Sequence, residues 1–105
     1  MKQHQLVSYL DSYLQIDTFR PIDYSLNSLV VSAPDEREVK RVCTAVDASL
    51  STFERAIDEG CDLLIVHHGL FWGSPLAITG AHYRRIKTLL DANVSLYVAH
   101  LPLDA

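Results

Sequence analysis

The sequence predicts an α/β fold in which a mostly parallel sheet is flanked by helices. Two short apolar runs, within residues 62–66 and 94–99, enclose a segment with helical spacing of apolar residues at 81–92. Unbroken apolar runs of this length are typical of strands buried on both faces. The order strand, helix, strand predicts parallel pairing with right-handed crossovers. A length of 105 residues suits one domain, 1–105.

The N-terminal part supplies a helix and two strands. Residues 2–15 have the spacing of an amphipathic helix, and Pro21 closes this opening unit. Its apolar face is predicted to consist of Leu6, Leu10, Tyr13 and Leu14. Residues 29–32 and 39–46 look like strands, with the turn Ala33-Pro34-Asp35 between them.

The next helix is predicted from its two ends. Ser51 and Glu54 have the spacing of a capping box, and Gly60 is a natural helix stop, so we expect a helix over about 51–60. Its buried face would be Phe53, Ala56 and Ile57. The strand at 62–66 then follows after a very short turn.

A long loop, from His67 to about Gly80, precedes the second crossover helix at about 81–92. A loop of this length can cover a site. The helix is predicted to bury Tyr83, Ile86, Leu89 and Leu90, to leave Arg84, Arg85 and Lys87 mostly outward, and to end at Asn93. Right-handed crossovers would place residues 47, 67 and 100 at one edge of the sheet.

Charge and composition exclude several classes of protein. Nine basic against thirteen acidic residues give a net charge of −4, so we expect no nucleic-acid partner. No apolar stretch has the length of a membrane span, and no signal peptide follows Met1, so we expect a cytoplasmic protein. Cys43 and Cys61 lack C-x-x-C spacing and are predicted to be two reduced, buried thiols.

The pair His67-His68 is the main candidate site, because it follows the apolar run 63–66 and precedes Gly69. In open α/β sheets, ligands bind beyond the carboxyl ends of the strands. Imidazoles there are suitable ligands for a divalent metal ion, and glycine lets the backbone approach a ligand closely. A histidine pair with only a structural role is the alternative.

Adjacent side chains of an extended backbone point to opposite sides, so we do not expect His67 and His68 to chelate one ion easily. Each could bind one of two neighbouring ions, with Asp104 as the bridging carboxylate. His100 directly follows the strand at 95–99 and could act in proton transfer or support a ligand. Alone, Asp104 would be a solvated loop carboxylate, and Asp47 either supports a ligand or, as we favour, merely begins a loop.

Other residues have weaker claims. Arg84 and Arg85 could hold an anionic substrate group, although a solvated helix face is the simpler interpretation. His4 and His82 are expected at the surface. The motifs G-x-S-x-G, H-E-x-x-H and G-x-G-x-x-G and a Walker A loop do not occur in the sequence.

Several segments resemble the Nif-three-like dinuclear metal-binding family, whose members are often called type 2 GTP cyclohydrolase I homologues. The most specific are I-V-H-H-G-x-F-W at 65–72 and H-L-P-L-D-A at 100–105, supported by residues 45–49, 56–64, 78–80 and 95–99. Asn27-Ser28-Leu29-Val30-Val31 is similar to the family's N-G-L-Q-V segment, with Ser28 in place of glycine and Val30 in place of glutamine. The resemblance spans nearly the whole chain.

The resemblance implies a Nif-three-like fold and a site for two divalent ions, chosen among Zn, Fe, Mn, Ni and Mg. His67, His68 and Asp104 match its ligand positions, and the carboxylate bridges the ions. Its other ligands, a His and a Glu near the far C-terminus of the longer family members, have no counterpart here. The chain thus corresponds to the N-terminal half of a member, and the family assembles as a homo-oligomeric hexamer.

These interpretations lead to two hypotheses about function. The first is a metal-dependent hydrolase at full length, acting on a small phosphorylated or nucleotide substrate, with His100 as a possible proton shuttle. The second is a non-catalytic metal-binding module for assembly, metal delivery or regulation. Three ligands are few for two ions, so the 105 residues alone should bind metal more weakly than a full-length relative.

Overall fold

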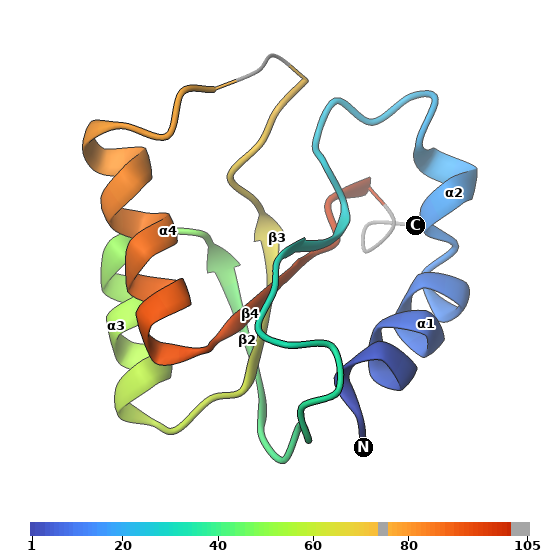
Figure 1. Ribbon diagram of the computed structural model, residues 1–105. Helices are drawn as coiled ribbons and strands as arrows, with labels where there is room; N and C mark the ends of the chain where they lie inside the picture. The colour runs from blue at the N-terminus through green and yellow to red at the C-terminus, as the bar shows by residue number, and fades with distance from the viewer. Residues whose placement is uncertain (74–75, 102–105) are drawn as a thin grey trace.

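A computed structural model describes residues 1–73 and 76–101 and confirms the α/β fold. Four strands form one sheet in the order β1-β4-β3-β2 (Figure 1). They are β1 (Ser28–Val31), β2 (Val42–Asp47), β3 (Leu63–His68) and β4 (Ser95–Val98). β3 pairs parallel with β2 and β4, as predicted, while β1 pairs antiparallel with β4. The carboxyl ends of β2, β3 and β4 therefore lie at one edge.

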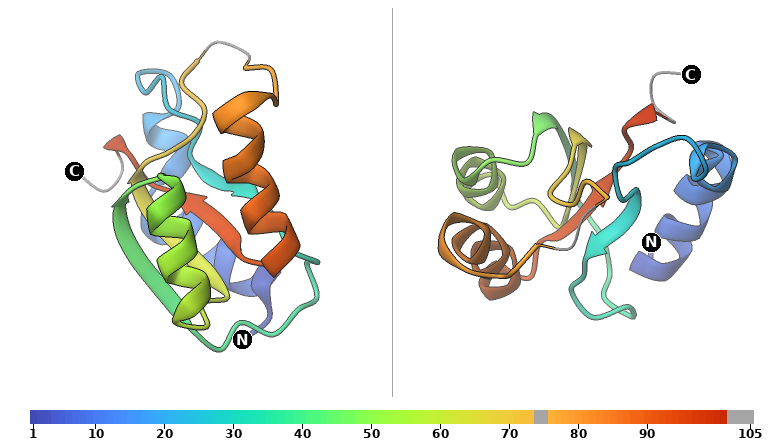
Figure 2. Two further views of the ribbon diagram at one scale, coloured as in Figure 1. Left: turned by 90° about the vertical axis from the view of Figure 1, so that its left-hand side faces the viewer. Right: turned by 90° about the horizontal axis from the view of Figure 1, so that it is seen from above.

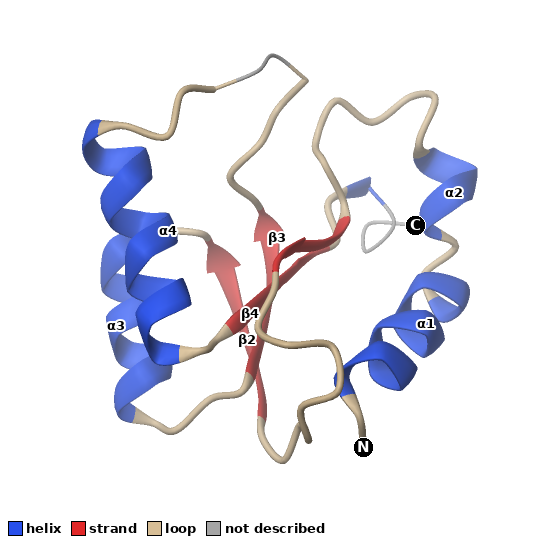
Figure 3. Ribbon diagram, in the orientation of Figure 1, coloured by secondary structure: helices blue, strands red, loops and turns tan. Residues whose placement is uncertain are grey.

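Helices cover both faces of the sheet (Figures 2 and 3). One face carries α3 (Leu50–Asp58) and α4 (Gly80–Ala92), and the other carries α1 (Gln3–Tyr13) and the short α2 (Ile16–Phe19), which the sequence pattern did not predict. In β3, Leu64 and Val66 belong to the apolar core under α3 and α4, while Leu63 belongs to the core on the α1 side. Burial on both faces explains the unbroken apolar run.

The strands nearest the candidate site differ from prediction at their ends. β2 begins at Val42 rather than at 39, and it includes Asp47. β3 continues through His68, so the histidine pair forms the end of the strand rather than the beginning of the loop. The extension follows from pairing: Asp47 is the register partner of His68, and the Ala48 N–H donates to the His68 carbonyl at 3.0 Å.

Helix α3 has the predicted buried face, but its N-cap lies two residues before the predicted one. Ser49, not Ser51, is the N-cap, and its hydroxyl accepts the Thr52 N–H at 3.3 Å. The extended backbone of Ser49 makes this geometry possible, whereas Ser51 already lies in the helix. Phe53 and Ala56 are buried, and Gly60 adopts a φ of 73° just after the helix.

Tertiary packing reverses several predictions of burial. Tyr13, Tyr83 and Leu90 are exposed, although their spacing predicted buried positions. His82 is buried, although it was expected at the surface, because α4 turns His82, Ile86 and Leu89 inward. Asn93 ends α4, as predicted, and the structure shows it in the left-handed conformation. In the described part of the chain, no helix is long and apolar enough to cross a membrane.

The two cysteines are free thiols. Cys61 is buried, as predicted, while Cys43 is only partly buried. Burial, together with the neighbouring Cys43 thiol, raises the pKa of Cys61 to about 12. A thiol with so high a pKa is a poor nucleophile at neutral pH. Cys61 therefore has a structural role in the apolar core.

The start of β1 contains an unusual backbone conformation. Ser28 has a φ of 74°, in the left-handed region that favours glycine. It occupies the glycine position of the similar N-G-L-Q-V segment. Its hydroxyl donates to Asp11 Oδ1 at 2.6 Å, a contact that glycine could not make.

Candidate metal centre

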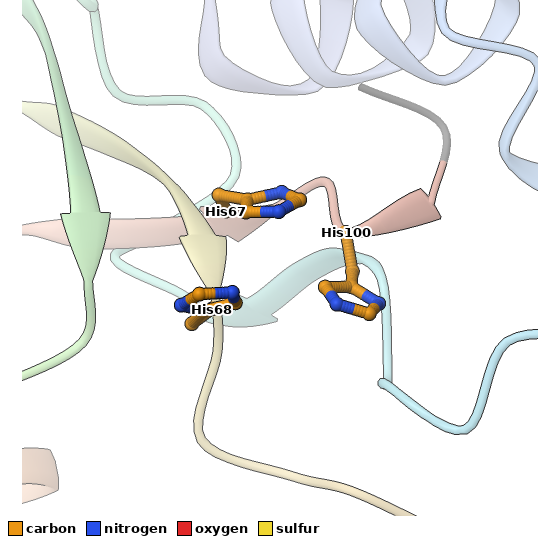
Figure 4. Close-up of side chains that lie close together, drawn as sticks. All are labelled: His67, His68 and His100. Atoms are coloured by element: carbon orange, nitrogen blue, oxygen red, sulfur yellow. The ribbon is translucent and has the colours of Figure 1, made fainter. Parts of the chain in front are cut away.

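Three histidines meet at the carboxyl edge of the sheet (Figure 4). His67 and His68 end β3, and His100 follows β4, its neighbour in the sheet. The parallel pairing continues beyond β4, since the Ala99 N–H donates to the Val66 carbonyl at 3.0 Å. This pairing carries residue 100 to the level of the histidine pair, as the right-handed crossovers predicted.

The three rings are close together. Ring centroids lie 4.6 Å apart for His67 and His68, 4.9 Å for His67 and His100, and 5.7 Å for His68 and His100. Taking one ring nitrogen from each histidine, the three nitrogens all lie within 4.8 Å of one another. Metal–nitrogen bonds of about 2.0–2.1 Å and paired ions about 3.5–4 Å apart require spacings on this scale.

The rings of His67 and His68 lie close together, although neighbouring side chains in a strand point to opposite faces of the sheet. Leu64 and Val66 pack on one face of the sheet and Leu63 on the other, so the two histidine side chains also leave the strand on opposite faces. However, side chains in strands can lean along the strand direction. At the end of β3 both imidazoles can turn past the sheet, and the rings come together there.

His67 is held by the backbone of the neighbouring strand segment. Its Nδ1 lies 3.2 Å from the carbonyl oxygen of Ala99. A carbonyl oxygen only accepts hydrogen bonds, so Nδ1 carries the proton in this contact. In the neutral ring, Nε2 then bears the lone pair that a metal ion requires.

His68 is oriented by Asp47 from β2. Its Nδ1 lies 2.8 Å from Asp47 Oδ1. Such a carboxylate partner fixes the tautomer and the ring direction of a metal-binding histidine. Of the two roles considered for Asp47, the structure favours support of His68, because the residue is the last of β2 rather than part of a free loop.

His100 is oriented by Asp23, which no sequence pattern had singled out. The His100 Nδ1 lies 3.0 Å from Asp23 Oδ1, and the Asp23 side chain is only 2% exposed. Burial alone would raise the pKa of Asp23. Hydrogen bonds from the Asn27 amide and the Leu101 and Ser25 N–H groups, together with His100, lower that pKa to about 2. The ionised carboxylate thus accepts from His100 Nδ1.

All three histidines therefore point Nδ1 at an acceptor, and this arrangement fits a metal centre. Each Nδ1 contacts a carbonyl or carboxylate oxygen, so in the neutral ring Nε2 bears the lone pair. Imidazole nitrogen is a good ligand for Zn, Fe and Ni ions. The donor set and its supporting contacts are consistent with a divalent ion at this edge.

The structure does not test the roles of the remaining predicted site residues. Asp104 lies outside the described residues, so its bridging role stays a prediction. Arg84 is exposed on α4 and Arg85 is partly buried there, and their substrate role also stays a prediction. His4 is exposed, as expected, and lies 3.5 Å from Glu36.

Two further residues complete the surroundings of His100. Asn27 Oδ1 accepts the His100 N–H at 2.9 Å, while its amide donates to Asp23. The Trp72 ring lies edge-on to His100 with centroids 4.8 Å apart, and its Nε1 donates to the Gly69 carbonyl. Both occur in the segments that carried the family resemblance, and this was the available sequence signal.

Comparison with known proteins identifies the family. The family model described as Duf34/NIF3 (NGG1p interacting factor 3) matches residues 1–105. A curated relative from Deinococcus radiodurans, named GTP cyclohydrolase 1 type 2 homolog, is 50% identical over 101 residues, which cover 96% of this chain and 37% of the relative. A relative of the same name from Archaeoglobus fulgidus is 47% identical, with 100% of this chain and 41% of the relative covered.

Solved structures agree with this assignment. The crystal structure of TTHA1606 from Thermus thermophilus matches with a TM-score of 0.94 at 51% identity, over 100% of this chain and 42% of that one. The protein ybgI, described as of unknown function, matches with a TM-score of 0.89 at 38% identity, over 100% and 41% of the two chains. The present chain spans about two fifths of the length of these relatives. It belongs to the Duf34/NIF3 family.

Proposed function

We propose that this member of the family contributes one side of a divalent-metal site in a metal-dependent hydrolase. His67 and His68 are the proposed metal ligands from the described residues, and Asp104 is the proposed carboxylate that bridges two ions. Further ligands would come from outside these 105 residues, since the relatives are more than twice as long. The ions would be two among Zn, Fe, Mn, Ni and Mg.

The observation that carries the proposal is the shared orientation of the three imidazoles. Three histidines could meet at a sheet edge for structural reasons alone. A structural cluster would not need every Nδ1 to be bonded to an oxygen acceptor, yet each ring here is held in that way. Contacts of this kind typically orient metal-binding histidines.

A bound divalent ion would supply Lewis acidity and lower the pKa of water at the site. The chain's own residues would orient and deliver protons. Asp47 and the Ala99 carbonyl hold His68 and His67 in place. His100, paired with the ionised Asp23, is the candidate proton shuttle, because this pair can stabilise a protonated imidazole. His68 is exposed, so a substrate can approach from solvent.

The names of the relatives suggest a nucleotide substrate, and we include a small phosphorylated or nucleotide molecule in the proposal. A homo-oligomer is likewise part of it. The second candidate function is a metal-binding module without catalysis, acting in assembly, metal delivery or regulation. It is favoured by the same histidine cluster, since orientation of Nδ1 serves metal binding whether or not a reaction follows.

Calorimetric titration of the natural full-length protein with Zn²⁺ and Mn²⁺ tests the metal site. We expect His67→Ala and His68→Ala each to weaken binding at least about 100-fold, since each removes a direct ligand. Asp47→Asn should weaken binding about 10- to 100-fold through loss of orientation. His4→Ala, which changes an exposed histidine on α1, should leave affinity unchanged. Wild-type affinity in both cluster variants would refute the metal site.

Turnover separates the two candidate functions. The full-length, metal-loaded protein is tested with bis(4-nitrophenyl) phosphate and with GTP. Metal-dependent hydrolysis that disappears in His68→Ala and persists in His4→Ala supports the enzyme. Tight metal binding with no turnover of either substrate supports the module.

A further inference from the structure

A hollow of about 390 Å³ lies beside Asp23, the carboxylate that holds His100. One wall is formed by Arg20 and residues 23–26, and the other includes Phe71 and Gly73 from the loop after β3. Asp23, which holds His100, is part of the first wall, so this carboxylate connects the hollow to the histidine cluster. We call it the Arg20 hollow.

The two walls are fixed relative to each other. The Leu26 N–H donates to the Phe71 carbonyl at 2.9 Å. Gly73 lies under Tyr24: a Cβ on this glycine would stand 3.6 Å from the Tyr24 carbonyl oxygen and 3.8 Å from its Cδ1. Phe71 is held by an edge-on contact with buried His82, with ring centroids 5.1 Å apart. These contacts hold the two walls of the hollow in place.

The walls offer flat apolar surface. Tyr24 is 83% exposed, and Leu26 beside it is also exposed. These side chains contribute little to the apolar core, so core packing does not explain why apolar residues occupy these positions. Exposed aromatic rings that line a hollow can stack on a flat ring of a ligand at little entropic cost.

Arg20 gives the hollow a side chain that can bind an anion. Asp23 is in the wall, but its two oxygens already accept four hydrogen bonds, from the Ser25 and Leu101 N–H groups, the Asn27 amide and His100. Arg20 brings a guanidinium that is 70% exposed and contacts only one oxygen of exposed Asp17 among the described residues. Exposed pairs of this kind are weak, and a guanidinium has five N–H donors for bidentate binding of phosphate.

Ser25 supplies a second, independent sign of a missing ligand. It is 6% exposed, and its Oγ has no hydrogen-bond partner within the described part of the chain. Buried hydroxyls without a partner are rare. Ser25 lines both the Arg20 hollow and a smaller adjoining space of about 40 Å³, and Arg20 lines both as well. A phosphate oxygen bound in the hollow would give this hydroxyl an acceptor.

We propose that the Arg20 hollow binds the substrate as a phosphorylated flat ring, with the phosphate on Arg20 and Ser25 and the ring against Tyr24 and Phe71. This assignment rests on the proposed function, because it supplies the substrate class and the recognition site for the adjacent histidine cluster. Binding in the hollow needs no metal ion, so the two proposals can fail separately.

Phenyl phosphate is the probe, with inorganic phosphate and phenol as its two halves, titrated into the full-length protein by calorimetry or NMR. Phenyl phosphate should bind at least about tenfold more tightly than either half. Arg20→Ala should weaken phenyl phosphate about 10- to 100-fold, as expected for loss of a charged hydrogen bond, and leave phenol unchanged. Tyr24→Ala should weaken phenyl phosphate and phenol but leave inorganic phosphate unchanged.

Arg55→Ala is the matched control. Arg55 is also exposed, also forms a helical ion pair, with Glu59 at 3.4 Å, and lines a different hollow of about 360 Å³ between β2 and α3. Its replacement should change no affinity. Equal weakening in Arg55→Ala and Arg20→Ala, or no weakening in Arg20→Ala, overturns the proposal.

The same titrations in His68→Ala separate this proposal from the metal site. With the proposed metal ligand removed, phenyl phosphate should still bind, and Arg20→Ala should still weaken it. If binding disappears in His68→Ala and Arg20→Ala has no effect in the wild-type background, the phosphate sits on the metal ions; the proposed function then stands and the Arg20 hollow fails. If Arg20→Ala weakens binding while both histidine variants retain metal, the hollow stands and the metal site fails.

Discussion

Two carboxylates that are largely withdrawn from solvent, Asp23 and Asp62, stand at opposite ends of the sheet and have similar surroundings. Asp62, just before β3, accepts the Lys40 and Arg41 N–H groups on Oδ2 and the Arg37 guanidinium on Oδ1. Asp23 also accepts backbone N–H groups and a side-chain amide. In both, these hydrogen bonds outweigh burial, which by itself raises the pKa, and the pKa is lowered.

The two carboxylates differ in their ionisable hydrogen-bond donor, which is Arg37 for Asp62 and His100 for Asp23. The donors to Asp62 join it to residues 37–41, so its hydrogen bonds serve the fold. Asp23 has His100 among its partners, and an imidazole held at Nδ1 presents a second nitrogen elsewhere. A carboxylate withdrawn from solvent therefore indicates a functional site when one of its hydrogen-bond donors is an imidazole whose second nitrogen can act elsewhere.

The largest expected effect comes from the matched isosteric changes Asp23→Asn and Asp62→Asn. Each places an amide NH₂ against hydrogen-bond donors, so each should lower the free energy of unfolding by about 2–3 kcal/mol, measured by urea denaturation. Only Asp23→Asn should also lower metal-dependent turnover by the full-length protein, by about 100-fold, because it removes the carboxylate that orients the proposed proton shuttle His100. An equal loss of turnover in folded Asp62→Asn would remove the distinction between the two carboxylates.

The two glycines that flank β3 give the next contrast. A Cβ on Gly69 would lie 2.7 Å from both Cγ atoms of buried Val98, so Gly69→Ala should cost about 1–3 kcal/mol of stability and displace the histidine pair. Gly60 has open space but a φ of 73°, so Gly60→Ala should cost about 1 kcal/mol. Metal titration should show weaker binding in Gly69→Ala alone; unchanged stability and affinity there would contradict the close packing.

The smallest effect concerns acid stability. The folded pKa of Asp62 is depressed, so its contribution to stability is present above the ordinary aspartate pKa and is lost as pH falls through the lower folded value. Stability measured between pH 5 and pH 2, about the range of that transition, should fall less steeply in Asp62→Asn than in the wild type. The same slope in both proteins would show that Asp62 ionisation does not support the fold.

Prediction from sequence succeeded where local pattern and chain order decide. The apolar run of β3, the spacing of Phe53 and Ala56, and the strand and helix order led to the parallel sheet. Its topology placed 47, 67 and 100 at one edge, and the structure brings His68, Asp47 and His100 together there. The predicted burial was wrong for Tyr83, which is exposed, and for His82, which is buried, because helical spacing defines the buried face of a helix only to within one residue.

The sequence by itself determined the parallel pairing of three strands and the edge at which the histidine pair lies, because hydrophobic periodicity and parallel topology act through neighbouring residues and chain direction. Only the tertiary structure decided which groups orient the rings. Asp23 reaches His100 across 77 positions and Asp47 reaches His68 across 21. Hydrogen bonds need atoms within about 3 Å, and that proximity depends on packing of segments with no common local pattern.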